Sequence, residues 1–146
     1  MKIALASDHR GYRLKQELIE NLKQEYEIID LGTTSEESTD FPVYGIKLGE
    51  TIIENKESIG IAICGTGIGI SIAANKVKGI MCAKISNKEE ARLAKEHNRA
   101  NVIALSGNLT KEEALDMIYE FLNAKEIDEE KYTKRINQIR KYENGD

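Results

Sequence analysis

The chain has 146 residues, of which 32% are charged and 40% hydrophobic, and its formal net charge at pH 7 is -4. This length is ordinary for one domain and short for two, so we expect a single domain over residues 1–146. The acidic balance argues against a nucleic-acid-binding protein, which would carry a basic field, and the apolar runs are well short of the ~20 residues that span a bilayer. We therefore expect no nucleic-acid or membrane partner and a cytoplasmic location.

In the first half of the chain, short apolar runs alternate with segments whose apolar residues recur at helical spacing. We expect, in order, a strand at 2–6, a helix over 12–22, a strand at 27–31, a polar loop at 33–40, a helix over 41–53 and a strand at 59–63. The only proline, Pro42, falls in the first turn of its helix, where proline is tolerated.

The second half continues the same alternation. We expect a helix after a glycine-rich turn, a strand at 79–85, a helix from 86 to about 98, a strand at 101–105, a helix over 110–122 and a last helix over about 128–143. Two of these helices begin with the Ser/Thr-x-x-Glu spacing of a capping box, Ser86 with Glu89 and Thr110 with Glu113.

Strands that alternate with helices predict an α/β fold. We expect a three-layer α/β/α arrangement with a five-stranded parallel, Rossmann-like sheet and a C-terminal helix; the pattern leaves the strand order open. Ligands of such sheets bind beyond the carboxyl ends of the strands. This rule predicts that Asp8-His9, Cys64, Ser86 and the loop 106–108 lie along one edge.

The most distinctive stretch runs over 60–76, where an apolar strand passes through three glycines at alternate positions into a helix. Such a turn points several backbone N–H groups at one spot, where the helix dipole favours an anion. Cys64 lies at the mouth of this turn, and a thiol at a helix N-terminus is more readily a thiolate. A buried structural cysteine is the alternative interpretation, and these residues alone leave both open. The glycine spacing matches neither the dinucleotide fingerprint nor a Walker A loop.

Charged and titratable residues elsewhere allow two interpretations each. Asp8 suits either a helix cap or a site, and His9 either a surface position or a site. His97 is predicted near a helix C-terminus, where the dipole favours a protonated imidazole that could donate a proton, or it is simply solvated. The basic segment 131–141 could clamp a phosphate or form a solvated face. Two cysteines and two histidines without clustered spacing indicate no disulfide framework and no metal site.

Taken together, these residues resemble the type B ribose-5-phosphate isomerases, a family that also includes galactose-6-phosphate and allose-6-phosphate isomerases. The resemblance runs nearly from end to end. It is carried by the segments Ser7–Gly11, Thr39–Pro42, Ile63–Lys76 and His97-Asn98 before Ala100-Asn101-Val102. It implies an aldose–ketose isomerase that works through an enediolate without metal or cofactor, on ribose 5-phosphate in preference to a hexose 6-phosphate.

The resemblance also implies roles for particular residues. Cys64 matches the catalytic base, with Thr66 beside it to orient it, and His97 matches the residue that opens the sugar ring. Asp8 and Asn98 match positions that bind sugar oxygens, and Asp8 also assists ring opening. The backbone N–H groups of Gly65, Thr66, Gly67, Ile68 and Gly69 match the hole for the developing negative charge. The phosphate-binding positions match His9 and Arg135.

Three residues depart from the family pattern. Lys131 stands where a second phosphate-binding arginine is expected, Tyr132 where a histidine is usual, and Asn108 at another basic position. Lysine can still bind phosphate, but as a point charge. The resemblance further implies a homodimer, or a dimer of dimers, whose site is shared between two chains, with His97 supplied by the neighbour.

Rival interpretations remain at this point. A hexose-6-phosphate isomerase of the same family would differ in the sugar it converts. A non-catalytic module that binds phosphate or nucleotide at the glycine turn would not need Cys64. A cysteine hydrolase would form a covalent intermediate on Cys64, and a redox enzyme is disfavoured because Cys64 has no partner at Cys-x-x-Cys spacing.

Overall fold

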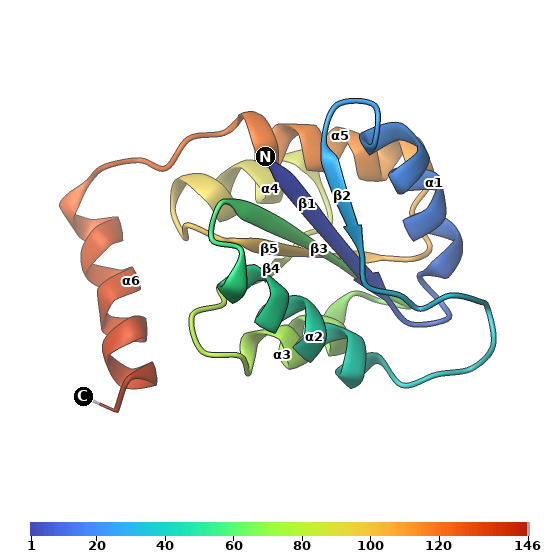
Figure 1. Cartoon of the computed structure of the whole chain (residues 1–146). Coiled ribbons are helices and arrows are strands. Elements are labelled where there is room, and N and C mark those ends of the chain that lie inside the picture. The colour runs from blue at the N-terminus through green and yellow to red at the C-terminus, as the bar shows by residue number, and fades with distance from the viewer. Residues whose placement is uncertain (146) are drawn as a thin grey trace.

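A computed structural model of the chain describes residues 1–145, which form one five-stranded sheet and six helices (Figure 1). The elements in chain order are β1 (Lys2–Ser7), α1 (Tyr12–Leu22), β2 (Glu27–Asp30), α2 (Phe41–Glu54), β3 (Ser58–Cys64), α3 (Ile68–Asn75), β4 (Cys82–Lys84), α4 (Lys88–Glu96), β5 (Val102–Ser106), α5 (Lys111–Asn123) and α6 (Glu130–Glu143). The predicted α/β fold with a parallel sheet and a C-terminal helix is confirmed.

The strand order, which the sequence left open, is β2-β1-β3-β5-β4. The chain moves from β1 outward to β2 and then crosses back to β3, so the order reverses between β1 and β3. Ser7 at the end of β1 pairs with Ile63, and Cys64 at the end of β3 pairs with Ser106 on β5. The segments after these three strands therefore leave the sheet side by side. The point of reversal in such a sheet is where ligands bind.

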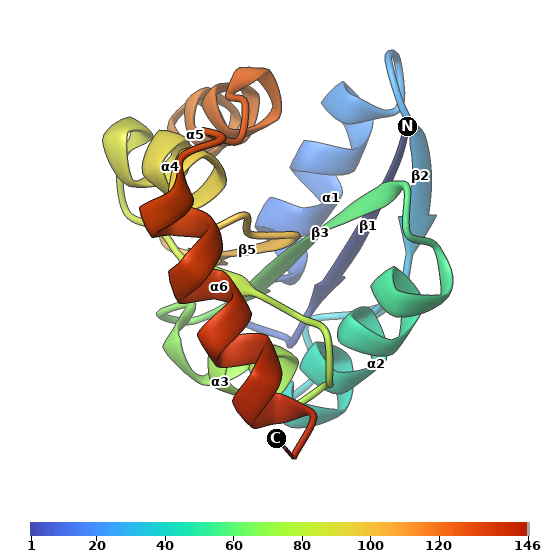
Figure 2. The ribbon, with the colours of Figure 1, turned by 90° about the vertical axis from the view of Figure 1, so that its left-hand side faces the viewer.

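Helices cover both faces of the sheet. Helices α1, α4 and α5 lie over one face, and α2 and α3 lie over the other (Figures 1 and 2). The apolar residues of α1 recur every four positions, and Leu14, Leu18 and Leu22 are fully buried against the sheet. All seven residues of the central strand β3 are buried, because helices pack on both of its faces.

Helix α6 stands apart from the two helical layers (Figures 1 and 2), and residues of α6 and β4 line one cavity. Among its described residues only Ile136 is buried. Polar contacts hold the two ends of the helix: the Arg99 guanidinium donates to the Thr133 hydroxyl at 2.6 Å, and the backbone N–H of Gly79 donates to the Glu143 carboxylate at 2.9 Å. This helix is attached by few contacts and presents most of its side chains outward.

Two details of the predicted elements are wrong. The fourth strand is shorter than 79–85, because Gly79 turns the chain with a φ of 93° and the Met81 N–H is bonded to the Asn101 side chain instead of a strand. The cap of α4 is one residue later than predicted: the Asn87 side chain accepts the Glu90 N–H at 2.8 Å, and the Glu90 carboxylate accepts the N–H of Ser86.

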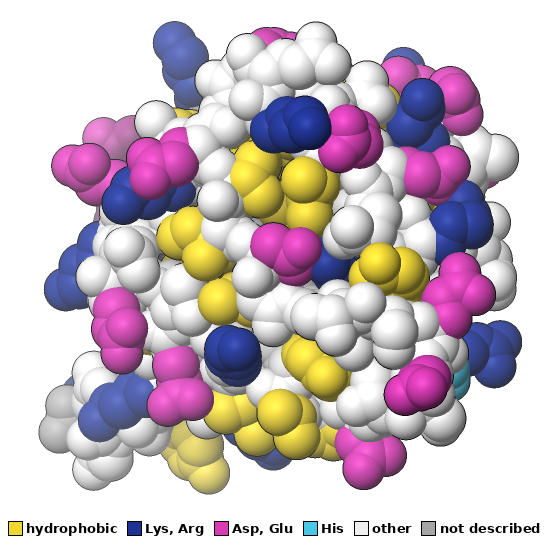
Figure 3. Space-filling model, turned by 45° about the vertical axis from the view of Figure 1, so that its right-hand side comes forward, with side chains coloured by type: hydrophobic (Ala, Val, Ile, Leu, Met, Phe, Trp, Pro, Cys, Tyr) yellow, Lys and Arg dark blue, Asp and Glu magenta, His cyan; other side chains and the backbone are white. Residues whose placement is uncertain are grey.

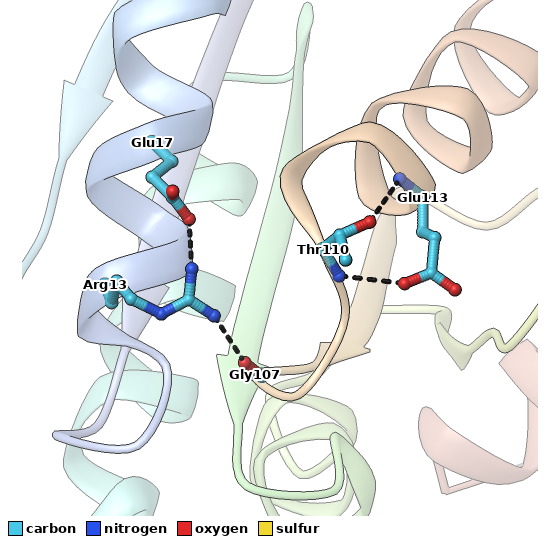
Figure 4. A network of polar contacts seen from close by, with 5 residues as sticks. All are labelled: Arg13, Glu17, Gly107, Thr110 and Glu113. Atoms are coloured by element: carbon cyan, nitrogen blue, oxygen red, sulfur yellow. Dashed lines mark hydrogen bonds and ion pairs between the residues drawn. The ribbon is translucent and has the colours of Figure 1, made fainter.

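The predicted capping box at the start of α5 is confirmed (Figure 4). The Thr110 hydroxyl accepts the Glu113 N–H at 3.1 Å, and the Glu113 carboxylate accepts the Thr110 N–H at 2.9 Å. The backbone hydrogen bond from Thr110 lowers the pKa of Glu113. Both groups satisfy helix N–H donors that would otherwise have no partner.

We expect Thr110→Ala to lower the free energy of unfolding by about 1 kcal/mol, since the replaced hydroxyl leaves a helix N–H without its acceptor. Urea denaturation followed by circular dichroism measures this change. The exposed Thr34 offers a matched Thr→Ala control outside any helix, for which we expect no measurable change. Equal stability of the two variants would show that the box does not stabilise the fold.

Charged side chains of both signs are interspersed on the face that Figure 3 shows, with apolar groups between them. This distribution differs from the single-sign basic surface that nucleic acids require. Within residues 1–145 no helix combines the length and apolar character needed to cross a membrane.

Candidate active site at the carboxyl ends of β1 and β3

A cleft of about 770 Å³ opens where β1 and β3 end. Its walls come from the loop after β1, the loop before α2 with the start of that helix, the glycine turn after β3 and the loop after β5. The lining residues are Asp8, His9, Arg10, Thr39, Asp40, Phe41, Pro42, Val43, Cys64, Gly65, Thr66, Gly69 and Asn108. The predicted convergence of Asp8, His9, Cys64 and Asn108 at one edge is thus confirmed. Ser86 is not among the lining residues; it follows the edge strand β4, and its hydroxyl accepts a bond from Lys84.

Asp8 is buried, with 6% of its surface exposed, and its carboxylate shapes the loop that carries it. One oxygen accepts the backbone N–H groups of Arg10 at 2.9 Å and Gly11 at 3.2 Å. Asp8 therefore fixes the turn that leads into α1, and it also lines the cleft. The helix-cap interpretation of Asp8 is wrong, because the N-cap of α1 is Gly11 and no side chain of the described residues caps this helix. The site role stays a prediction, for which the carboxylate has acceptor sites left for a sugar hydroxyl.

Cys64 ends β3 at the floor of the cleft, with only 5% of its surface exposed. The backbone N–H of Gly67 donates to its sulfur at 3.2 Å. Gly67 has a φ of 82°, and a Cβ at this position would lie 2.9 Å from the carbonyl carbon of Leu105, so the turn requires glycine. The turn brings a backbone dipole to bear on the sulfur, an arrangement suited to a negatively charged atom.

The N–H groups of the glycine turn divide into two sets. Gly67 bonds the sulfur, and Ile68 bonds the Thr66 hydroxyl at 3.1 Å. Among residues 1–145 no acceptor is found for the N–H groups of Gly65, Thr66 and Gly69. These three donors remain to bind an anion in the cleft, beside the N-terminus of α3.

Within residues 1–145 no hydrogen bond joins the Thr66 hydroxyl to the Cys64 sulfur, and the role of Thr66 in orienting Cys64 stays a prediction. The Thr66 hydroxyl is engaged by Ile68, and the hydrogen bond to the Cys64 sulfur comes from Gly67. Thr66 acts on the turn that carries the sulfur. The turn is also tied to β5, because the Ser106 hydroxyl donates to the Gly65 carbonyl at 2.8 Å and the Gly107 N–H donates to the Cys64 carbonyl at 2.8 Å.

His9 is held from outside the β1 loop. The Thr39 N–H donates to its Nδ1 at 3.1 Å, and this leaves Nε2 to carry the proton in the neutral ring. Thr39 also donates through its hydroxyl to Tyr44 at 3.4 Å. Hydrogen bonds with Thr33 and then Thr39 lower the pKa of Tyr44. The polar loop before α2 is thereby tied to the histidine of the cleft.

The other predicted site residues lie elsewhere on the chain. His97 caps the C-terminus of α4, and its ring stacks on Tyr132 with centroids 4.3 Å apart and planes 11° apart. Asn98 lines a separate cavity of about 380 Å³ beneath α6. Lys131 and Arg135 are exposed on α6, and Lys131 lies 5.0 Å from the Tyr132 ring centroid. None of these four residues lines the cleft at Cys64.

The two cysteines have different surroundings. Cys82 lies on β4, where burial raises its pKa to about 12 and keeps the thiol neutral near pH 7. It lines the cavity beneath α6 and not the cleft. Cys64 is therefore the cysteine that can act on a ligand in the cleft.

Several lining residues were not predicted as site residues, notably Arg10, Asp40, Phe41 and Val43. Phe41 forms an apolar wall over the turn: a Cβ at Gly69 would lie 2.7 Å from the tip of its ring. Their residue types carry no catalytic pattern, but Arg10, Asp40 and Phe41 lie within the segments 7–11 and 39–42 that carry the resemblance, and Val43 follows the second, which was a usable signal. No cluster of three or more His, Cys, Asp or Glu suited to a metal ion occurs in the described part of the chain.

Comparison with known proteins gives a consistent result. Residues 3–139 match the model of the ribose/galactose isomerase family. The probable ribose-5-phosphate isomerase B of Mycoplasma pneumoniae is 41% identical over 144 residues, which cover 97% of this chain and 94% of that protein. Ribose-5-phosphate isomerase B of Escherichia coli is 37% identical over 139 residues, which cover 94% and 93%.

Two solved structures extend the comparison to the fold. Ribose-5-phosphate isomerase B of Clostridium thermocellum has a TM-score of 0.93 at 43% identity, with 99% of each chain covered. The enzyme of Mycoplasma genitalium, with bound ribulose-5-phosphate, has a TM-score of 0.92 at 35% identity, with 99% of this chain and 97% of that chain covered. This chain belongs to the ribose/galactose isomerase family, the family of the type B ribose-5-phosphate isomerases.

Proposed function

We propose that the protein interconverts ribose 5-phosphate and ribulose 5-phosphate through an enediolate, with Cys64 as the base and without a metal ion. The observation that carries this proposal is the cysteine on the floor of the cleft with three unpaired N–H donors beside it. It is supported by a relative of 35% identity that holds ribulose-5-phosphate. Because the reaction is a proton shift between neighbouring carbons, a base and an anion site suffice for it.

In the forward direction the Cys64 thiolate removes the proton from C2 of the open-chain aldose. The electron pair forms the C1–C2 double bond, and the aldehyde oxygen becomes an oxyanion that Gly65, Thr66 and Gly69 can bind. The thiol then returns the proton to C1 and is a thiolate again, while the proton of the C2 hydroxyl passes to the C1 oxygen, so that C2 becomes the ketone and C1 carries a hydroxyl. A positioned base contributes about 10²–10⁴-fold to such a step, and an oxyanion donor contributes about 10²–10³-fold.

The separation of the predicted site residues into two groups supports a site built from two chains. Cys64 and Asp8 lie in one cleft, whereas His97 and Arg135 lie outside it. Beside the cleft, exposed apolar side chains of α2 and α3 line a groove of about 260 Å³. A second copy of the chain packed on this groove could bring its His97 to the cleft, where a protonated imidazole would open the sugar ring. We therefore propose a homodimer, or a dimer of dimers, with shared sites.

The test of the function is incubation of purified protein with ribose 5-phosphate and EDTA, with ribulose 5-phosphate measured as product. Conversion in the presence of EDTA supports a metal-independent isomerase. Conversion that stops with EDTA and returns with a divalent cation would contradict metal independence. If ribose 5-phosphate does not react, the same assay with allose and galactose 6-phosphates tests the hexose alternative, and failure with all three would contradict isomerase activity.

Under this proposal Arg135 of one chain binds the phosphate in the cleft of its partner. We expect Arg135→Ala to raise the KM for ribose 5-phosphate about tenfold or more with little change in kcat, because the contact is made before and during the reaction alike. Arg140→Ala, five residues later in α6 and likewise exposed, is the matched control. An unchanged KM in Arg135→Ala would place the phosphate elsewhere.

A further inference from the structure

One cationic side chain that lines the cleft at Cys64, that of Arg10, has no role assigned so far. Among the described residues that line the cleft, Asp8 and Asp40 are acidic and Arg10 is the one Lys or Arg. The Arg10 side chain is exposed. The ion pairs formed within residues 1–145 include Arg13, Arg92 and Arg99 but not Arg10. Arg10 is therefore free to bind an anion that enters the cleft.

The backbone around Arg10 is firmly placed. Its N–H is bonded to the Asp8 carboxylate at 2.9 Å. Its carbonyl oxygen lies so close to Gly107 that no Cβ could fit there, so the β1 loop packs directly against the loop that carries Asn108. The side chain lies against Gly65, the first glycine of the turn: a Cβ at Gly65 would lie 3.4 Å from the Arg10 Nε and 3.8 Å from its Cζ.

We propose that Arg10 binds the phosphate group of the substrate from within the cleft, an inference that rests on the proposed function. The Cys64 sulfur is buried whereas the Arg10 side chain is exposed, so a sugar phosphate with C1 and C2 at the sulfur would meet Arg10 with its phosphate end. Asn108, on the neighbouring loop, is uncharged and supplies no cation. The planar guanidinium can bond two phosphate oxygens at once, which neither Asn108 nor Lys131 can do.

The experiment compares Arg10→Met, which removes the charge and keeps the length of the side chain, with Arg10→Lys, which keeps the charge and loses the fork. We expect Arg10→Met to raise the KM for ribose 5-phosphate by about tenfold to 100-fold with kcat within about twofold, and Arg10→Lys to fall between. Inorganic phosphate should lose potency as a competitive inhibitor by the same factor.

The matched control is Arg13→Met, which makes the same charge change one turn further along. The Arg13 guanidinium is already engaged by Glu17 and by the Gly107 carbonyl (Figure 4). Equal increases in KM for Arg10→Met and Arg13→Met would show that the effect comes from the change in net charge alone, and this would overturn the assignment. A loss of kcat with unchanged KM would overturn it too, because Arg10 would then act on the reacting oxygens.

Calorimetric titration with inorganic phosphate separates this inference from the proposed function. Phosphate binding that is weakened in Arg10→Met and unchanged in Arg13→Met supports the site even in a protein that converts none of the sugars. Failure of the parent protein to isomerise ribose 5-phosphate would contradict only the function. Unchanged phosphate affinity in Arg10→Met would contradict the role of Arg10.

Discussion

Cys64→Ala is expected to lower kcat for ribose 5-phosphate by about 10³-fold or more, while the dissociation constant for the sugar phosphate stays within about twofold. The substitution removes the base, but it leaves Asp8, His9 and the unpaired N–H groups in place to bind the ligand. Formation of ribulose 5-phosphate gives kcat, and calorimetric titration with ribose 5-phosphate gives the dissociation constant.

Cys82→Ala is the matched control for this substitution. Cys82 is the other free cysteine, it lies outside the cleft, and burial raises its pKa to about 12. We expect its removal to leave kcat unchanged. Full activity in Cys64→Ala would exclude Cys64 as the base, and loss of sugar-phosphate binding together with activity would show that Cys64 is needed for the shape of the turn.

Mixing two inactive variants is expected to restore activity if the site is shared between chains. Cys64→Ala damages the cleft, and His97→Asn damages the group supplied by the partner. In a mixed dimer one site collects both substitutions and the other collects neither. Random exchange at equal concentrations should therefore restore about a quarter of the parent activity. Subunits are exchanged by mild denaturation and refolding, and turnover of ribose 5-phosphate is measured before and after.

A mixture of Cys64→Ala with Cys64→Ser is the control for the exchange procedure, because both substitutions fall in the same cleft and no intact site can form. Recovery limited to the Cys64→Ala and His97→Asn pair supports the shared site. An absence of recovery, with mixed dimers demonstrated by native mass spectrometry, would mean that each chain uses its own His97 or that His97 is dispensable.

Much of the fold could be predicted from sequence because apolar periodicity reports local burial. The leucines of α1 and the continuous apolar run of β3 mark a helix face and a central strand without further information. Strand order could not be predicted, because parallel pairing depends on where each connecting helix crosses the sheet. The cap of α4 was misplaced because Ser86 and Asn87 are both good caps, and only the geometry shows which side chain reaches an unpaired N–H.

The candidate site, like the fold, could be predicted from the sequence only in part. Asp8 and Cys64 each follow a parallel strand, so their convergence follows from the topology of the fold. The pairing of His9 with Thr39 was not predictable, because it depends on how the polar loop before α2 folds back. The separation of His97 from the cleft of its own chain was likewise not predictable, because the local sequence at a helix end is the same whether the residue contributes to its own chain's site or to a partner's.

The stack of Tyr132 on His97 makes α6 more than a carrier of positive charge. The same helix bears Lys131 and Arg135, and it rests on the body of the protein through a single buried side chain and a few polar contacts. Under the proposed function, α6 therefore both binds the phosphate of the substrate and positions the His97 imidazole at the sugar ring. A sugar without a phosphate would then lose ring opening as well as binding affinity, so α6 would select substrates by the distance between the phosphate and the sugar ring.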